Sequence, residues 1–440
     1  MRKTHLLPVA CMALAVLTAP RAQTGPDEFE RKLAALEGRM AELTAQYEAQ
    51  IEALKKEVAA LREAATSGRQ APGLPAAPAA PPAANLLNPS LSVIPDFTFS
   101  AGNDSRWTAS DAAALRELEL SFSASIDPYA RAFASLALHK HGHSEALADR
   151  FGGERGHEEE EHAASEGYTV DVEEAYAVFP GLPGGLTLKA GRFYAGFGKE
   201  NAHHLHTWPQ ADRPLALNAV LGGEGHGLSD VGLGLTKILP TPWLSDITAE
   251  VLGGRSEDLF GGRRSDLAYL LAWRHFWDLS EESSVEALLS GLGGKNETGG
   301  ATRLGNLSLT YRWRPLSNRH RALLWRTEYL RRDDGVHGPA ADHAVSASPL
   351  RWTERTEGLF SYVDWQVARG WSLGARADWV KYPGLGRRDQ GGALVLTWYP
   401  SEYQKLRVQI QRVDYAVLGP KNALVVEYGF SLGPHGAHPF

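Results

Sequence analysis

The most constraining feature of this sequence is an alternation of apolar and polar residues with a period of two, which begins near residue 90. In the segment 306–313, every second residue is leucine, tyrosine or tryptophan, and the residues between them are polar or charged. The segments 118–124, 373–379 and 406–411 repeat the pattern. A two-residue period places alternate side chains on opposite faces of a β-strand. The sequence therefore predicts strands with one apolar face and one wet face.

Together these strands predict an all-β fold, a transmembrane antiparallel β-barrel over residues 88–440. We count about 16 strands, and bacterial barrels of one chain have an even number. A soluble β-sandwich shows the same alternation, but so much antiparallel sheet must close to remove its edges. Hydrophobic residues make up 43% of the chain and its mean hydropathy is −0.28, too polar for a helical membrane protein. Aromatic residues, which form girdles at membrane interfaces, stand near predicted strand ends at Trp313, Trp325, Trp379, Trp398, Tyr399 and Tyr415.

The connections between the predicted strands alternate in length. Short ones contain Pro or Gly, as at 127–128 and 180–184, whereas longer polar ones fall at 102–114, 139–166 and 195–224. Short turns belong to the periplasmic side of an outer-membrane barrel and long loops to the exterior. Sixteen strands would leave both barrel ends in the periplasm and would enclose a water-filled lumen unless a loop closes it.

Residues 1–22 have the features of a secretory signal peptide. Arg2 and Lys3 precede an apolar stretch that is shorter than the roughly 20 residues of a spanning helix, and we expect cleavage after Ala22. Cys11 is the single cysteine, and its position inside the apolar stretch disfavours a lipoprotein anchor. The mature chain is therefore expected to have neither disulfides nor cysteine-based metal or redox centres. A net charge of −7 gives no indication of a nucleic-acid partner.

Residues 23–65 are predicted to form an α-helical coiled coil. Apolar residues recur at alternating spacings of four and three from Phe29 to Leu61, with one extra four-residue step between Tyr47 and Ile51. A single amphipathic helix is the alternative, but no globular segment lies nearby in the sequence for it to cover. Residues 66–87 are rich in proline and alanine, which predicts an extended spacer before the barrel.

Two regions carry a resemblance to a known family. The segment 88–97 lies at the first predicted strand, and Glu173 to Tyr176 followed by 183–193 forms a strand, a turn and a strand before a long connection. In these segments the chain resembles Gram-negative outer-membrane porins with an N-terminal coiled coil, a group that includes phosphate-selective porins. The resemblance implies location in the outer membrane, contact with its lipid, and a homotrimer joined by a coiled coil in the periplasm.

The resemblance also concerns the end of the barrel. Barrels of this class usually end in phenylalanine, which implies that Phe440 is read by the barrel assembly machinery. The segment 433–439 interrupts the alternation, however, so Phe430 and Leu432 are alternative ends of the last strand. A TonB-dependent receptor is disfavoured, because the chain has no plug domain and too few barrel residues for 22 strands.

Histidine is conspicuous, with 16 copies that are unevenly placed. Imidazole nitrogens near carboxylates can bind Zn²⁺ or another divalent transition metal, although the predicted function requires no cofactor. Two of the long connections are rich in histidine, and in porins the third exterior loop often folds inward to narrow the pore. The alternative is that these are solvated, charged loops. The candidate metal ligands are His139, His141, His143, His157 and His162 in one connection, and His203, His204 and His206 in the other.

Alternation also predicts which charged residues face the lumen, where rings of charge set the ion preference of a channel. The acidic ones fall on early strands and the basic ones on later strands, which predicts a transverse field without clear selectivity. Strict alternation places Glu174 on the lipid face, so a β-bulge or an interfacial position is expected there. The predicted lumen-facing residues are Glu119, Asp171, Glu173, Arg303, Arg312, Arg326, Arg376 and Arg407.

The sequence thus predicts an outer-membrane porin for passive passage of small polar solutes or ions, linked to zinc through its histidine-rich loops. One alternative is a structural envelope protein, with the barrel as anchor and the coiled coil as periplasmic spacer. Another is an outer-membrane metal receptor. No catalytic motif such as Gly-x-Ser-x-Gly or His-Glu-x-x-His is present, so no enzymatic activity is expected.

Overall fold

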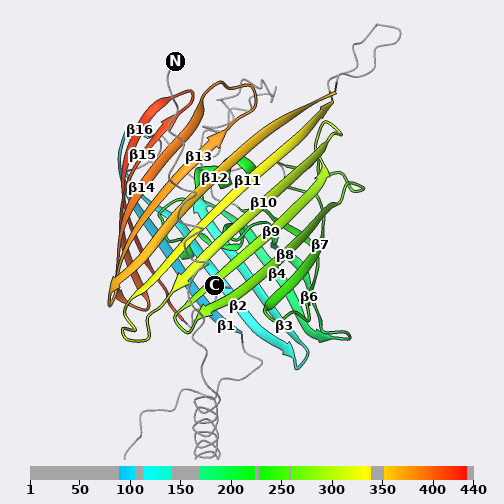
Figure 1. Cartoon of the computed structure of the whole chain (residues 1–440), viewed down its shortest axis with the longest axis horizontal. Coiled ribbons are helices and arrows are strands. Elements are labelled where there is room, and N and C mark those ends of the chain that lie inside the picture. The colour runs from blue at the N-terminus through cyan, green and yellow to red at the C-terminus, as the bar shows by residue number, and fades with distance from the viewer. Residues whose placement is uncertain are drawn as a thin grey trace, which may run out of the picture. The chain divides into compact units, whose positions relative to one another are not determined.

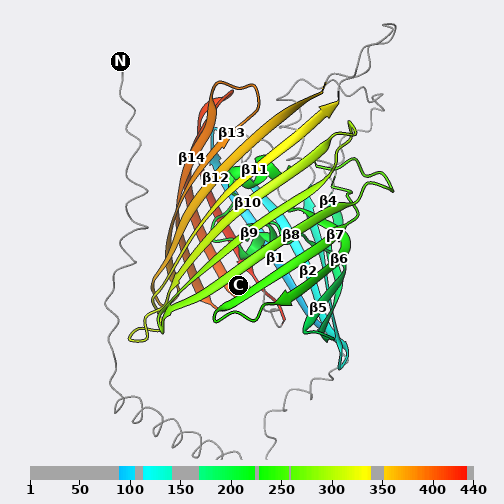
Figure 2. The same ribbon diagram turned by 45° about the vertical axis from the view of Figure 1, so that its right-hand side comes forward.

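The computed structural model describes residues 89–104, 112–140, 168–222, 227–256, 259–337 and 351–433. Within them, sixteen antiparallel strands form a closed barrel in which each strand pairs with its neighbours in sequence and β1 pairs with β16 (Figures 1 and 2). The predicted barrel and its strand number are confirmed. The predicted signal peptide, coiled coil and spacer, and also Phe440, lie outside the described residues.

The strands follow one another around the wall in chain order. Their bounds are β1 Ser90–Gly102, β2 Ala113–Asp127, β3 Ala130–Lys140, β4 Tyr168–Leu182, β5 Leu186–Tyr194, β6 Ser229–Ile238, β7 Leu244–Leu252, β8 Ala268–Ser280, β9 Ser283–Lys295, β10 Ala301–Trp313, β11 Ala322–His337, β12 Arg351–Ala368, β13 Trp371–Lys381, β14 Arg388–Ser401, β15 Gln404–Tyr415 and β16 Gly419–Phe430.

The two-residue alternation separates the outer face of the wall from the inner face. In β10, Leu307 is 55% exposed on the outer face, whereas its neighbours Asn306 and Ser308 are buried inside. Leucine, valine and tryptophan side chains are exposed around the rest of the outer face. Arg303 was predicted to face the lumen and does not, because it lies an even number of residues from Leu307 and is exposed on the same outer face.

Two β-bulges add charged residues to the inner face. The pairing of β3 with β4 shifts between Ser135 and Leu136, which leaves Glu173 as an extra residue in β4. Glu173 and Glu174 are consequently both buried inside the barrel. The pairing of β1 with β2 shifts in the same way and leaves Arg116 as the extra residue of β2. The bulge expected at Glu174 is therefore present, and it turns that side chain away from the lipid face.

Aromatic side chains lie on both faces of the wall. Trp371 and Trp398 stack on adjacent strands with ring centroids 5.7 Å apart, and both are about 40% exposed. Tyr415 was predicted to belong to an interfacial girdle, but it is 3% exposed and its hydroxyl donates to Asp104. It therefore belongs to the interior of the barrel.

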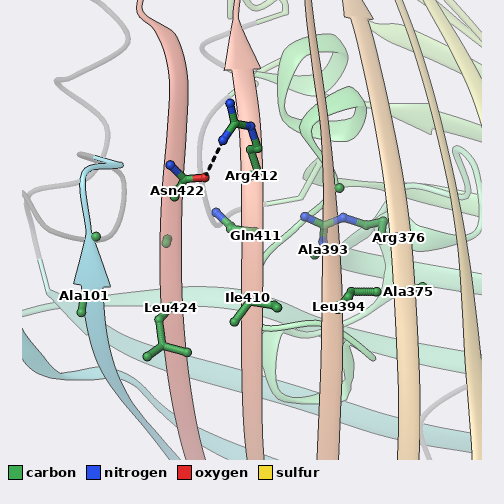
Figure 3. A pocket seen from close by; sticks show the side chains of 13 residues that line it. Ala101, Ala375, Arg376, Ala393, Leu394, Ile410, Gln411, Arg412, Asn422 and Leu424 are labelled. Carbon is green, nitrogen blue, oxygen red and sulfur yellow. Dashed lines mark hydrogen bonds between the residues drawn. The ribbon is translucent and has the colours of Figure 1, made fainter.

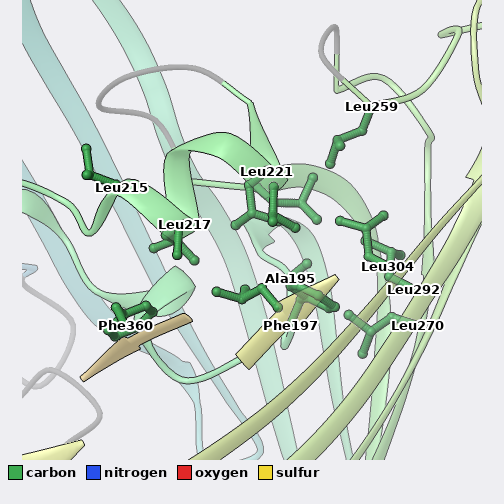
Figure 4. Packing of buried hydrophobic residues seen from close by; sticks show 14 of the residues in the cluster. Ala195, Phe197, Leu215, Leu217, Leu221, Leu259, Leu270, Leu292, Leu304 and Phe360 are labelled. Carbon is green, nitrogen blue, oxygen red and sulfur yellow. The ribbon is translucent and has the colours of Figure 1, made fainter. Parts of the chain in front are cut away.

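The connection between β5 and β6 folds into the interior of the barrel. We call its described residues 195–222 the inner segment; it contains the 3₁₀ turns η3 Glu200–Ala202 and η4 Leu205–Thr207 and the helix α4 Leu215–Leu221 (Figure 2). Leucines of α4 pack with Phe197 against inward-facing apolar residues of the wall such as Leu270, Leu304 and Phe360 (Figure 4). One side of the lumen is thus an apolar core. None of the helices among the described residues has the length and apolar character needed to cross a membrane.

Candidate functional site

The inner segment touches the wall where α4 meets β12. Gly358 of β12 faces Ala216 of α4, and a Cβ atom added at Gly358 would lie 2.7 Å from the Cβ atom of Ala216. A larger residue at either position would push α4 away from β12. The helix has seven residues and no side-chain cap, so packing rather than helix propensity holds it in place.

Wall side chains accept hydrogen bonds from the backbone amides at the start of the inner segment. Glu328 of β11 accepts from the amides of Lys199 and Glu200 at 3.1 and 2.8 Å. Ser290 accepts from Gly198, whose φ of +68° favours glycine. A Cβ atom at Gly198 would also lie 2.5 Å from the carboxylate of Glu328, so only glycine fits this approach.

Wall cations hold the carbonyl groups of the same segment further along. Arg407 donates to the carbonyl oxygens of Trp208 and Gln210 at 2.7 and 2.9 Å. Arg376 donates to that of Asp212 at 2.9 Å, and Lys405 to that of His206 at 2.9 Å. A segment inside a barrel lacks a strand partner for these groups, so side chains take its place.

A buried ion pair fixes the first 3₁₀ turn. The carboxylate of Glu200 accepts from Arg326 of β11 and, at 3.2 Å, from the hydroxyl of Tyr362. His203 lies beside it, with Nδ1 3.4 Å from the same carboxylate oxygen. Burial alone would raise the pKa of Glu200, but Arg326 and His203 outweigh it and hold the pKa well below its usual range.

A second group, which we call the carboxylate–histidine cluster, lies between β2, β4 and the second 3₁₀ turn. It comprises Glu119, Glu173, Glu174, His204 and His206. Nδ1 of His204 is 3.0 Å from Glu173 and its Nε2 is 3.0 Å from Glu174. The same Oε2 atom of Glu119 lies 2.8 Å from Nδ1 of His206 and 3.4 Å from Nδ1 of His204.

Carboxylates surround His204 on both ring nitrogens. Burial disfavours the charged imidazole, but the hydrogen bonds to Glu119, Glu173 and Glu174 outweigh it and hold the pKa of His204 well above its usual value. A proton on His204 therefore offsets part of the negative charge of the cluster. The cluster binds the inner segment to the acidic side of the wall. Arg326, Arg376 and Arg407 bind the same segment to the basic side of the wall.

The structure places the predicted histidines in three settings. His204 and His206 belong to the cluster, while His203 points instead to Glu200 and Arg326. His139 is the second-last residue of β3 and pairs with Asp171 of β4 at 2.8 Å, near the end of the barrel where β3 and β4 meet the connection 141–167. The remaining candidates His141, His143, His157 and His162 lie outside the described residues.

The charged residues predicted for the lumen are less open to it than a water-filled pore implies. Arg326 is 2% exposed and Arg407 is 1% exposed, because the inner segment covers them. Arg407 also pairs with Glu427 at 2.6 Å, and Arg376 pairs with Asp212 and Asp378 at 2.9 and 2.7 Å. Arg312 is half-buried on the inner face. These pairs reduce the transverse field that the separation of signs predicted.

Several functional residues of the site were not singled out from the sequence. Glu200 lies in the histidine-rich connection itself, and its partner on the wall cannot be read from a local pattern. The wall residues Glu328 and Gln409 did stand at inward positions of alternating segments. Gln409 accepts from the amide of Ala211 at 2.8 Å. The alternation indicated only that these side chains face inward. It did not indicate that the inner segment would cover them.

A groove of about 710 Å³ lies on the outer face of the wall, across strands β13 to β16 and β1 (Figure 3). Exposed Leu394, Ile410 and Leu424 line it, and Arg412 donates to Asn422 at its edge at 3.4 Å. Small residues such as Gly392 leave the backbone uncovered between these side chains. Arg376, which also contacts the inner segment, is among the residues that line this groove.

Comparison with known proteins gives few relatives by sequence and several by fold. No protein-family model matches the chain. A protein of Aquifex aeolicus (strain VF5), described as uncharacterized, is 29% identical over 308 residues, 61% of this chain. The match covers 63% of that relative, less than two thirds of its length.

The solved structures that resemble the chain include a porin. An anion-selective porin from Comamonas acidovorans has a TM-score of 0.50 at 11% identity, over 78% of this chain and 99% of that one. OprB from Pseudomonas putida has a TM-score of 0.49 at 11% identity, over 78% and 94% of the two chains. The chain therefore has the fold of the porins, a closed barrel of sixteen antiparallel strands.

Proposed function

We propose that this protein is a porin-type channel of the Gram-negative outer membrane for the passive passage of small polar solutes or ions. The observation that carries the proposal is a closed sixteen-stranded wall with apolar side chains outside and the inner segment folded into its lumen. A barrel of this strand number is wide enough for an aqueous path, and the inner segment narrows that path. The inner segment then sets the size of the solute that passes.

The ion preference of the proposed channel follows from the pairing of its inner charges. Arg326, Arg376 and Arg407 each meet a carboxylate, so few of the wall charges remain to attract one sign of ion. We therefore expect weak selectivity. In the same proposal the coiled coil of residues 23–65 lies in the periplasm and joins three copies, and the barrel assembly machinery inserts the chain.

The test is conductance of the purified full-length protein in planar lipid bilayers, with the reversal potential measured across a salt gradient. Discrete conductance steps and a small reversal potential are expected. Absence of conductance from folded, inserted protein would contradict the channel and favour the alternative of a structural envelope protein. Chemical cross-linking with and without residues 23–65 tests the trimer, which should be lost with the coiled coil.

A further inference from the structure

We propose that the carboxylate–histidine cluster is a binding site for one divalent transition-metal ion of the zinc type, which ties the inner segment to the wall. Its ligands are Glu119 of β2, Glu173 of β4 and His204 of the inner segment, with His206 as the fourth donor. The donor atoms of Glu119, Glu173 and His204 all lie within 4.8 Å of one another. A set of imidazole nitrogens and carboxylate oxygens suits zinc and its neighbours rather than Ca²⁺ or Mg²⁺.

The spacing of the donor atoms fits a four-coordinate ion. Zinc bonds of roughly 2.0–2.1 Å to nitrogen and oxygen place tetrahedral ligands about 3.3 Å apart. In the structure, Nδ1 of His204 lies 3.0 Å from Oε2 of Glu173 and 3.4 Å from Oε2 of Glu119. Nδ1 of His206 lies 2.8 Å from the same oxygen of Glu119. These three separations are close to those of ligands that share one ion.

The atoms that would not contact the ion are already hydrogen-bonded. Oε1 of Glu119 accepts from the hydroxyl of Ser121, and Oε1 of Glu173 accepts from the hydroxyl of Tyr194 at 3.1 Å. Nε2 of His204 faces Glu174 at 3.0 Å. Such a carboxylate on the far nitrogen fixes the ring so that the other nitrogen presents its lone pair to a metal. Glu119, Glu173 and His204 are thus each oriented by a second partner, as in built metal sites.

Buried negative charge supplies an independent reason for a cation. Glu119, Glu173 and Glu174 are each at most 6% exposed, and buried charges are normally paired or bound to metal. Arg116 is engaged by Asp96 and Glu427, and Lys189 lies 3.7 Å from Glu174. Among the described residues, the buried Oε2 of Glu119 at the centre of the cluster is contacted by the imidazoles of His206 and His204, at 2.8 and 3.4 Å.

Direct binding measurements test the proposal without reference to conductance. The folded full-length protein is stripped with a chelator and titrated with Zn²⁺ by calorimetry and with Co²⁺ by visible absorption. We expect one buried ion per chain and the intense Co²⁺ bands of a four-coordinate site. Absence of those bands from the wild-type protein would overturn the proposal, whatever the variants do.

Variants locate the ion. The double variant Glu119→Gln/Glu173→Gln should lose this binding, and Glu174→Gln should weaken it by about 10- to 100-fold, as loss of an orienting partner does. Glu250→Gln is the matched control, because Glu250 is a buried wall carboxylate that accepts from Gly196 of the inner segment outside the cluster. Heat-modified mobility in gels verifies that each variant is folded.

Deletion of residues 141–162 separates this site from the histidines of the exterior connection. The deletion should leave the four-coordinate Co²⁺ spectrum intact. Loss of all binding on deletion, or wild-type binding by the double variant, would show that the ion is held elsewhere and would refute the site. A further effect rests on the proposed channel: Zn²⁺ should reduce the conductance of the wild type and leave the double variant unchanged.

Discussion

At the scale of single residues, buried ion pairs fix the contacts between the wall of the barrel and the inner segment. Arg326 and Glu200 are both almost fully buried, and Tyr362 completes the contacts of the carboxylate. Such a pair contributes little net stability relative to an apolar pair, but removal of one partner leaves a buried charge and costs about 3–5 kcal/mol. The inner segment is therefore held most firmly where its charges are matched.

The Arg326–Glu200 pair predicts a defined dependence of stability on pH. Since the pKa of Glu200 is lowered in the folded chain, its contribution is complete above its unfolded pKa of about 4.3 and is lost as pH falls through the folded value. Glu200→Gln should destabilise the barrel by about 3 kcal/mol at neutral pH. The difference from wild type should persist to about pH 5 and shrink in stronger acid.

Thermal unfolding in detergent, followed over this pH range, measures the effect. Glu281→Gln, in the exposed turn between β8 and β9, is the matched control and should change nothing. A difference between wild type and Glu200→Gln that is constant down to strong acid would contradict the assignment.

At the scale of elements, the strands and the inner segment are specified in different ways. Each strand is fixed by a local two-residue pattern, which is why sixteen strands and the inward position of Glu119 could be predicted from the sequence. The bulges could not be located with certainty, because they arise from pairing with a neighbouring strand. Arg116 was missed for this reason, and Glu174 gave a conflict that only a bulge resolves.

The inner segment was less predictable still. Its histidines and its length indicated a constriction, but its partners on the wall lie far away in the sequence. Leu215, for example, donates its amide to Asp378. No periodicity connects two such positions. The apolar core around α4 was also not predicted, because the strand number predicted a water-filled lumen.

Helix α4 is the element whose displacement should most change the proposed channel. Gly358→Val would clash with Ala216 and push the helix off β12, at a cost of about 1–3 kcal/mol for overpacking. We expect a larger single-channel conductance with more fluctuation. Gly305→Val in β10 is the control, since no atom lies within 4 Å of a Cβ there. Equal conductance of wild type and Gly358→Val would show that α4 does not limit the path.

At the scale of the whole molecule, the exposed leucines of the wall need an apolar surrounding. Large apolar side chains exposed on every part of the outer face would aggregate the chain in water. A lipid bilayer removes this cost, and closure of the barrel leaves no edge among the sixteen described strands to expose its backbone to lipid. The proposed outer-membrane location thus follows from the outer face and not from the site in the lumen.

A charge placed on this face tests the membrane assignment. Leu307→Arg, at the middle of β10, should destabilise folding into lipid vesicles by about 2–4 kcal/mol. Leu316→Arg, in the turn after β10 where the side chain is 65% exposed, should cost less than about 1 kcal/mol. Urea titration of folding in vesicles gives both values. Similar values for the two variants would argue against a bilayer around β10.

The pairing of β1 with β16 has a consequence for how the barrel is made. The register joins Asp96 to Gly429 and Gly102 to Ala423, so the seam unites the two ends of the barrel sequence. Contacts between residues so distant in the chain form slowly, and until this one forms both edge strands can pair with other molecules. Before β16 has been synthesised, β1 has no partner on one side and its edge can aggregate with other chains. We therefore expect the chain to need a chaperone before it is inserted.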